Sequence, residues 1–264
     1  MSLVAGIDIG SRSTKAVIVD ELGAQRGRAV ARTQPDFPRL AREVLEAACR
    51  EGGVEPGEVS YLATTGFGRY GIPFRDIQIT EITCVARGAA SLFPATRSVL
   101  DIGAQSTRAI RVAQGKVAEF KTNDKCAAGA GGFLERAARY LEVRLEELGE
   151  LSLQADAPQP ISSVCAVLAE SEIINHVSAG RSVEAIIRGI HDALASRALT
   201  LLSRVGVEGE LTFVGGVARQ AGMTSALAAA ARLPVNVPEE PETVAALGAA
   251  LLGLQRLGRR GAAA

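Results

Sequence analysis

Two cysteines stand in the sequence directly ahead of helical patterns. Cys126 precedes a run of glycine and alanine at 127–132, and Cys165 precedes the helical pattern that begins at Ala166. The N-terminus of a helix presents unpaired N–H groups and a partial positive charge, which favour a thiolate and any anionic centre that the thiolate binds. Cys126 and Cys165 are therefore candidate ligands.

The other two of the four cysteines have a simpler interpretation. Cys49 and Cys84 fall in predicted helices, where a free thiol commonly fills a core position. Four cysteines without close pairing and without a secretory signal argue against a disulfide framework. The chain has only two histidines, His176 and His191, so a histidine-rich metal site or histidine-based catalysis is not expected.

A segment that starts with Asp-Ile-Gly occurs twice. Residues 8–19 align without gaps on residues 101–112, with Asp, Ile, Gly, Ser, Thr, Ala and Val in register and Arg in place of Lys. Both copies follow an apolar strand and run into further strands. A repeat of this length in two copies does not fit a solenoid. It indicates two duplicated lobes that face a cleft.

Each copy of the repeat ends a predicted strand with a carboxylate, Asp8 or Asp101. A carboxylate in this position can reach a divalent metal or its waters, while the glycine and the Ser/Thr turn that follow offer N–H and hydroxyl groups to phosphate oxygens. One copy alone would be an ordinary hairpin turn. Two facing copies favour a phosphate site.

Two further segments are rich in glycine. Gly215 and Gly216 follow a predicted strand at 211–214, and they would let a flat ring or a phosphate approach the backbone, although close packing of a helix on a strand explains them equally well. Residues 66–71 match the dinucleotide fingerprint, but the Ile-Pro-Phe at 72–74 is a poor helix start. We interpret residues 66–71 as a tight loop between lobes.

The composition fits a globular protein with two lobes, because 264 residues, 47% of them apolar, are ample for burial. Lys plus Arg and Asp plus Glu each number 29, and they are scattered, so neither a nucleic-acid groove nor a membrane-surface patch is expected. Without a signal peptide or a bilayer-length apolar run, we expect a cytoplasmic protein. The expected domains are 1–95, with the first hairpin, and 96–264, with the second hairpin, the candidate cysteines and the double glycine.

The two Asp-x-Gly hairpins and the double glycine resemble the α/β superfold of actin, hexokinase and the heat-shock-chaperone ATPases, in which ATP and magnesium lie between two duplicated lobes. More narrowly, nearly the whole chain resembles the activators of 2-hydroxyacyl-CoA dehydratases and the ATP-binding subunits of benzoyl-CoA reductase, the BadF/BadG/BcrA/BcrD ATPase family. The motifs that carry this resemblance are 6–15, 65–69, 80–82, 100–103, 123–129, 163–172, 213–218 and 246–250. The cysteine motifs are the specific part, since sugar kinases of the superfold lack them.

The resemblance implies a [4Fe–4S] cluster that bridges a homodimer, with Cys126 and Cys165 of each subunit as its ligands. Coordination chemistry agrees, because an all-thiolate cluster needs four ligands and a two-fold axis through it would complete the set. The alternatives are ordinary buried thiols and a zinc site. Zinc is disfavoured because paired C-x-x-C spacings are absent.

The resemblance also implies roles at the nucleotide. Asp8 and Asp101 would order Mg²⁺ and the attacking water, and Gln105 is the third predicted catalytic residue. The residues expected at the phosphates of ATP or ADP are Gly10, Ser11, Arg12, Ser13, Thr14, Lys15, Gly103 and Ala104. Gly215 and Gly216 would contact the adenosine.

The implied activity is ATP hydrolysis that drives one low-potential electron into a partner iron–sulfur dehydratase or reductase, with ferredoxin or flavodoxin as the donor. Closure of the lobes around the nucleotide would link the phosphates to a distant interface. The chain departs from the family pattern at Ser106, where Asp is common, at Val85, where His is usual, and at Gln220, where Asn is usual. These departures leave the hydrolysis rate and the exact subfamily open, including a heteromeric reductase subunit.

Two other classes of function stay open. A small-molecule kinase of the same superfold would use Asp101 as a base toward a bound hydroxyl, and it would purify without colour. A nucleotide-sensing or scaffold protein would bind ATP without turnover and would carry no iron.

Overall fold

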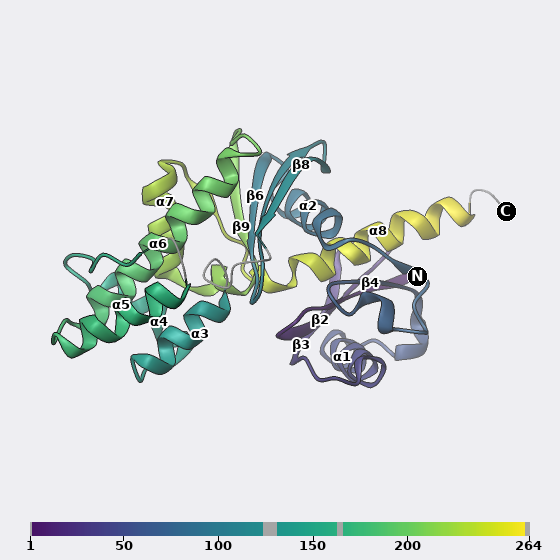
Figure 1. The fold of residues 1–264 in the computed structure, drawn as a ribbon. Helices are drawn as coiled ribbons and strands as arrows, with labels where there is room; N and C mark the ends of the chain where they lie inside the picture. The colour runs from purple at the N-terminus through teal and green to yellow at the C-terminus, as the bar shows by residue number, and fades with distance from the viewer. Residues whose placement is uncertain (1, 124–130, 163–165, 262–264) are drawn as a thin grey trace. The chain divides into compact units, whose positions relative to one another are not determined.

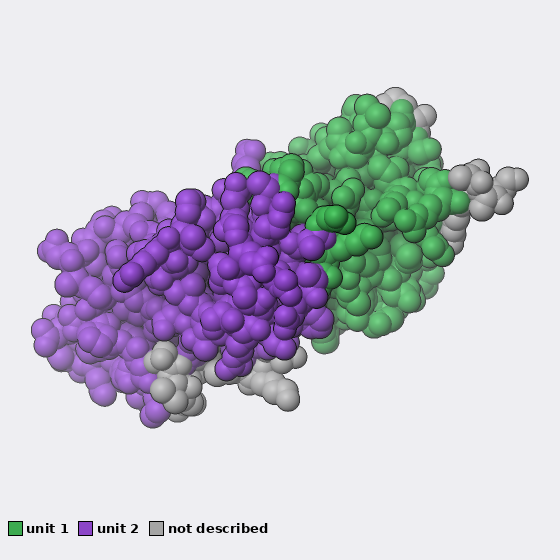
Figure 2. Space-filling view, turned by 90° about the horizontal axis from the view of Figure 1, so that it is seen from above, with its two compact units in different colours: residues 1–94, 114–117, 242–264 green, residues 95–113, 118–241 purple. Residues whose placement is uncertain are grey.

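The computed structural model describes residues 2–123, 131–162 and 166–261 (Figure 1). The chain divides into two compact units, which Figure 2 shows in different colours. Unit 1 comprises Met1–Pro94, Gln114–Val117 and Glu242–Ala264, and unit 2 comprises Ala95–Ala113 and Ala118–Pro241. The last segment of the chain thus belongs by its contacts to unit 1. The expected division into domains 1–95 and 96–264 follows chain order and stays a prediction.

Unit 1 is built on a five-stranded sheet of order β3-β2-β1-β4-β5. Its strands are β1 (Leu3–Ile9), β2 (Ser13–Val19), β3 (Gln25–Arg32), β4 (Val59–Thr65) and β5 (Ile77–Gln78). Strand β1 is antiparallel to β2 and parallel to β4. Every residue of β1 is buried, as its continuous apolar run predicts for a strand that is covered on both faces.

Helices cover both faces of this sheet. They are α1 (Phe37–Gly52), α2 (Glu81–Leu92) and α8 (Val244–Gly261), with short 3₁₀ turns at η1 (Pro56–Glu58), η2 (Arg69–Gly71) and η6 (Pro241–Thr243). Alternate residues of β1, such as Ile7, pack with α1, while Val4 packs with α8. Helix α8 lies directly on the backbone of β1, because a Cβ added to Gly6 would stand 2.1 Å from the Ala246 carbonyl oxygen.

The closing helix of the chain, α8, runs through Gly261. The apolar pattern continues at Leu257, which packs against the same buried cluster as Leu254. Within the described part of the chain, no helix is long and apolar enough to cross a membrane.

Unit 2 repeats the sheet of unit 1, with the order β10-β9-β6-β7-β8. Its strands are β6 (Thr96–Ile102), β7 (Thr107–Ala113), β8 (Lys116–Asn123), β9 (Glu210–Val214) and β10 (Val235–Asn236). As in unit 1, the first strand is antiparallel to its hairpin partner and parallel to the strand on its other side. The duplication predicted from the repeated sequence is confirmed.

The helices of unit 2 share one large core with its sheet. They are α3 (Gly131–Tyr140), α4 (Leu148–Leu153), α5 (Ala166–Ser178), α6 (Val183–Ser203) and α7 (Ala221–Ala231), with 3₁₀ turns η4 (Leu145–Glu147) and η5 (Gly216–Arg219). Figure 1 shows α3 to α7 gathered on one side of this sheet. Phe133 of α3, Ile173 of α5 and Ile190 of α6 meet Ile102 and Phe213 of the sheet in the core.

Candidate functional site

Asp8 lies one residue before the end of β1 and is only 5% exposed. The hairpin pairs it with Lys15 of β2, whose Nζ stands 3.0 Å from Asp8 Oδ2. The other carboxylate oxygen, Oδ1, is buried and has no hydrogen-bond partner among the described residues. An unsatisfied buried carboxylate oxygen is costly, so this atom is suited to accept from a ligand, an ion or an ordered water.

Asp101 occupies the same place in unit 2, one residue before the end of β6, and is 6% exposed. Its register partner in β7 is Arg108, whose Nη1 lies 2.7 Å from Asp101 Oδ2. The two turns also agree, because Gly10 N donates to Ser13 O at 3.1 Å and Gly103 N donates to Ser106 O at 2.9 Å. Each unit therefore presents a buried carboxylate that is held through one oxygen by a cation.

A glycine follows the parallel neighbour of each Asp strand. Gly66 comes directly after β4 and Gly215 directly after β9, and both have φ of +89°. A Cβ on Gly66 would lie 2.4 Å from Asp8 Oδ1, and one on Gly215 would lie 2.6 Å from Asp101 Oδ1. These positions require glycine, because a side chain would push into the Asp strand and would need a backbone conformation that other residues rarely adopt.

Gly66 was not among the predicted site residues, although it lies in the glycine-rich segment 66–71. The segment 66–71 belongs to unit 1, where Gly66 is the structural counterpart of Gly215. A signal was present in the sequence, since residues 66–71 and the double glycine are both rich in glycine and each comes after an Asp-x-Gly hairpin. As expected, residues 66–71 open no α-helix, because a 3₁₀ turn at Arg69–Gly71 leads into strand β5.

The predicted phosphate residues of unit 1 form one tight hairpin. Ser11 and Arg12 are exposed at the turn, while Thr14 is buried in β2. The hydroxyls of Thr14 and Thr33 lie 3.0 Å apart, and Thr33 Oγ1 donates to Gly10 O at 2.7 Å. The Thr14 hydroxyl thus helps to hold the turn. Gly10 and Ser13 are half-buried in the same hairpin.

In unit 2 the structure brings the second hairpin and the double glycine together, because β6 and β9 are parallel neighbours. Gly103 and Ala104 are half-buried, and Gln105 is exposed at the tip of the turn. Gly216 begins the 3₁₀ turn η5, and a Cβ there would meet nothing within 4 Å. The predicted residues thus form two groups, one around Asp8 in unit 1 and one around Asp101 in unit 2.

The start of α3 is bonded to this second loop. Gly131 N donates to Gly103 O, and Gly132 N donates to Ala104 O, both at 2.8 Å. Unpaired N–H groups at a helix N-terminus need partners, and here the loop carbonyls supply two. Sequence analysis did not predict this contact, because no sequence pattern places residues 131–132 beside residues 103–104.

A buried histidine supports the η5 turn. Gln220, which follows η5, accepts at Oε1 from His191 Nε2 at 2.9 Å and donates through Nε2 to Leu145 O at 3.3 Å. Burial lowers the pKa of His191 to about 4, with the nearby Arg188 charge as a smaller cause in the same direction, so the imidazole is neutral. This interaction ties α6, η4 and the segment after the double glycine together.

The candidate ligands Cys126 and Cys165 lie outside the described residues. The helices expected after them are confirmed, since α3 begins at Gly131 and α5 at Ala166. Cys49 and Cys84 are buried, as predicted for core thiols. Burial raises the pKa of the Cys49 thiol and raises that of Cys84 to about 12, so both stay protonated and are poor metal ligands. Among the described residues, no three His, Cys, Asp or Glu side chains gather to hold a metal.

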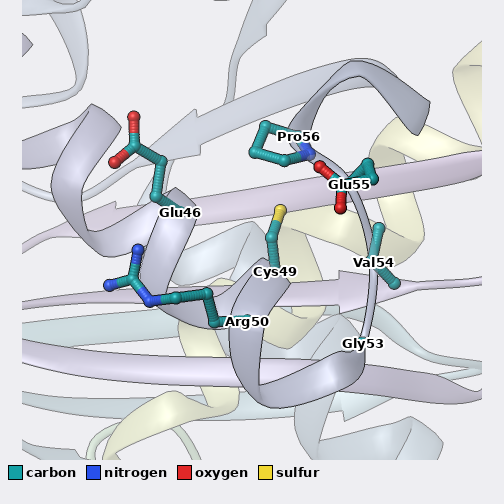
Figure 3. A pocket seen from close by; sticks show the side chains of 7 residues that line it. All are labelled: Glu46, Cys49, Arg50, Gly53, Val54, Glu55 and Pro56. Carbon is teal, nitrogen blue, oxygen red and sulfur yellow. The ribbon is translucent and has the colours of Figure 1, made fainter.

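A cavity of about 510 Å³ lies at the end of α1 (Figure 3). Its lining residues are Glu46, Cys49, Arg50, Gly53, Val54, Glu55 and Pro56. None of the predicted site residues is among them, and Figure 3 shows the Cys49 side chain directed toward Pro56. The cavity is therefore separate from both Asp groups.

Two similar sheets, each with an Asp-x-Gly hairpin, define the actin- and hexokinase-like ATPase fold. A glucokinase of the ROK family from Streptomyces griseus, solved with glucose and AMPPNP, superposes with a TM-score of 0.61 and 14% identity, covering 96% of this chain and all of its own. That likeness concerns the fold alone. The profile of the BadF/BadG/BcrA/BcrD ATPase family matches residues 5–253, and the chain belongs to this family.

Three relatives are similar to this chain over nearly their whole length. The activator of lactoyl-CoA dehydratase from Anaerotignum propionicum is 43% identical over 249 residues, which cover 93% of this chain and 95% of the relative. A benzoyl-CoA reductase subunit from Thauera aromatica is 40% identical, and the match covers 98% of this chain and 98% of the subunit. The activator of 2-hydroxyisocaproyl-CoA dehydratase from Clostridium difficile, solved with bound ADPNP, has a TM-score of 0.94 at 35% identity, with 99% of this chain and 98% of the activator covered.

Proposed function

We propose that this chain is an ATP-hydrolysing iron–sulfur activator, which drives a low-potential electron into a partner enzyme of the 2-hydroxyacyl-CoA dehydratase type. The observation that carries the proposal is the duplicated carboxylate–cation pair, Asp8 with Lys15 and Asp101 with Arg108. The chain that carries these pairs belongs to an ATPase family and is 43% identical to a dehydratase activator.

The carboxylate oxygens of Asp8 and Asp101 are suitable ligands for a magnesium ion that is bound together with ATP or ADP. Magnesium takes oxygen ligands and keeps several waters, and Asp8 Oδ1 is a buried oxygen without a partner among the described residues. Asp8 and Asp101 would hold the ion or its waters, and Gln105 would orient the attacking water. A bound magnesium ion would offset the charge that develops on the phosphates.

The hairpin residues would bind the phosphates. The set is Gly10, Ser11, Arg12, Ser13, Thr14, Lys15, Gly103 and Ala104. Lys15 and Arg108 each occupy one oxygen of their Asp, so they fix the carboxylate orientation and place positive charge beside the anion. Gly215 and Gly216 would receive the adenosine, because a Cβ on Gly216 would meet nothing within 4 Å and its backbone is therefore open to a ligand.

Cys126 and Cys165 would be the ligands of a [4Fe–4S] cluster that is shared by two subunits. The other cysteines, Cys49 and Cys84, are buried thiols with raised pKa values, which leaves two thiols per chain for an all-thiolate cluster of four ligands. A dimer with two-fold symmetry would complete the set. The cluster would store one electron, which ferredoxin or flavodoxin would donate. The protein would act in the cytoplasm.

A second function follows from a different relative. At 40% identity over 98% of both chains, the benzoyl-CoA reductase subunit supports an ATP-binding component of a reductase complex, in which two unlike chains would share one cluster. A small-molecule kinase is a weaker alternative, because the glucokinase likeness at 14% identity concerns the fold alone.

The test is ATP hydrolysis by anaerobically purified protein with no added acceptor. We expect turnover that falls roughly 100-fold in Asp8→Asn and in Asp101→Asn, because each variant loses a carboxylate that would hold Mg²⁺ or its waters beside the phosphates. The control is Asp156→Asn at an exposed position, which should keep full activity. Release of ADP only after a hydroxyl acceptor is added would overturn the proposal in favour of a kinase.

A further inference from the structure

The loop at Gly103 and Ala104 is joined to α3 through its carbonyl oxygens, which accept from Gly131 N and Gly132 N at 2.8 Å each. The contact is close, since a Cβ on Gly131 would lie 3.2 Å from Gly103 O and one on Gly132 would lie 3.0 Å from Ala104 O. A displacement of either loop carbonyl therefore has to move the first turn of α3 or break these hydrogen bonds.

Peptide geometry links these carbonyls to a ligand on the other side of the loop. A trans peptide is planar, and its N–H points away from its C=O. The Ala104 N–H belongs to the same peptide as Gly103 O, so it points away from α3. The Gln105 N–H belongs to the same peptide as Ala104 O and also points away from α3. An anion that accepts from these N–H groups would polarise both peptides and strengthen their bonds to α3.

One turn further along, α3 is bonded to α5. Arg136 Nε lies 2.6 Å from Glu170 Oε1, and Tyr140 Oη donates to Glu170 Oε2 at 3.2 Å. Arg136 Nη1 also donates to Gly132 O at 3.1 Å, within the turn that contacts the loop. Both oxygens of Glu170 are thus held by α3. The side chains of Arg136 and Glu170 are 35% and 20% exposed, so the ion pair is partly shielded from water.

We propose that Arg136 and Glu170 are positioning residues that transmit the nucleotide state of the 103–104 loop through α3 to α5. The inference rests on the proposed function in one respect, namely that phosphates bind at this loop. The connection consists of the hydrogen bonds from the first turn of α3 to the loop carbonyls and of the ion pair between Arg136 and Glu170. Helix α5 directly follows Cys165 in the sequence, so the signal would reach the segment proposed to hold the cluster.

The test is hydrogen–deuterium exchange of α5 amides in the full chain, purified anaerobically, with ADP and with ADPNP. Wild-type protein should show exchange rates in α5 that differ at least about fivefold between the two nucleotides, the lower end of usual coupling energies. Arg136→Gln and Glu170→Gln should lose this difference while they still bind nucleotide. The exchanged pair, Arg136→Glu with Glu170→Arg, should regain part of it.

The matched control is Arg144→Gln, which removes an exposed ion pair to Glu147 that lies within a single turn. This variant should respond to nucleotide as the wild type does. Tyr140→Phe, which deletes only one hydroxyl, tests the same connection if an Arg136 variant fails to fold.

The outcomes separate this inference from the proposed function. A full α5 response in Arg136→Gln, or a wild type that binds both nucleotides and shows no difference in α5, would overturn the inference and leave the proposed function intact. A wild type that binds neither nucleotide, as measured by titration calorimetry, would overturn both.

Discussion

Replacing Gly215 by alanine is the sharpest structural test of the Asp101 site. Gly215 has φ of 89° and ψ of 170°, a region that is almost exclusive to glycine. An alanine Cβ would lie 2.4 Å from Ile102 O and 2.6 Å from Asp101 Oδ1. Ile102 O is a backbone atom, so the contact cannot be relieved by a side-chain rotation.

The magnitude follows from two costs. A non-glycine residue in this conformation costs about 1–3 kcal/mol, and an added methyl group in a packed site costs about 1–3 kcal/mol more. We therefore expect Gly215→Ala to lower the free energy of unfolding by about 4 kcal/mol. At roughly 2–4 °C for each kcal/mol in a protein of this size, the melting temperature should fall by about 12 °C.

The assay pairs thermal unfolding with calorimetric titration of ADP, because a displaced Asp101 should weaken nucleotide binding as well. Gly66→Ala should give a loss of similar size, since its Cβ would stand 2.4 Å from Asp8 Oδ1. Gly57→Ala is the control, because a Cβ there meets nothing within 4 Å and its φ is not positive. A Gly215→Ala protein that melts within about 2 °C of wild type and binds ADP normally would show that this position does not require glycine.

Two further predictions concern buried charge. Lys15→Met should lower the free energy of unfolding by about 3 kcal/mol in urea titrations, because Asp8 stays buried without its cation. The double variant with Asp8→Asn should recover most of that loss. A near-zero effect of Lys15→Met would show that the ion pair is not stabilising. Burial lowers the pKa of His191 to about 4, so between about pH 6.5 and 4 the unfolded chain binds a proton that the folded chain does not, and stability falls as pH falls. Urea titrations at stepped pH should show that the free energy of unfolding of wild type falls by about 3 kcal/mol more across that window than that of His191→Gln. If the free energies of the two proteins change with pH in parallel, the imidazole is not buried in its neutral form.

The repeated sequence was enough to predict the duplicated sheets, because the hairpin is a local structure. Asp8 and Lys15 are cross-strand partners seven residues apart, and Asp101 and Arg108 are their counterparts. Alternating or continuous burial on each strand then fixes the register, since a slip by one residue would turn the apolar face outward. The hairpins could be predicted without any distant contact.

The contacts of α3 could not be predicted in the same way. Gly131 and Gly132 bond to residues 103–104, and Arg136 bonds to Glu170, in each case across tens of residues and between helices or loops with no shared pattern. Helix periodicity predicts which face is buried, but it does not specify the neighbour against which that face packs. The equivalence of Gly66 and Gly215 was hidden for a similar reason, because it rests on which strands are parallel neighbours.

The proposed [4Fe–4S] cluster is tested most directly by the content of iron and acid-labile sulfide in anaerobically purified protein, measured together with the mass of the dimer. We expect about four irons per dimer in wild type, and loss of the iron in both Cys126→Ser and Cys165→Ser. Cys49→Ser, at a buried thiol outside the proposed ligand set, should keep the iron and serves as the control. A colourless wild-type protein that binds ATP normally and holds no iron would show that the chain is not an iron–sulfur activator.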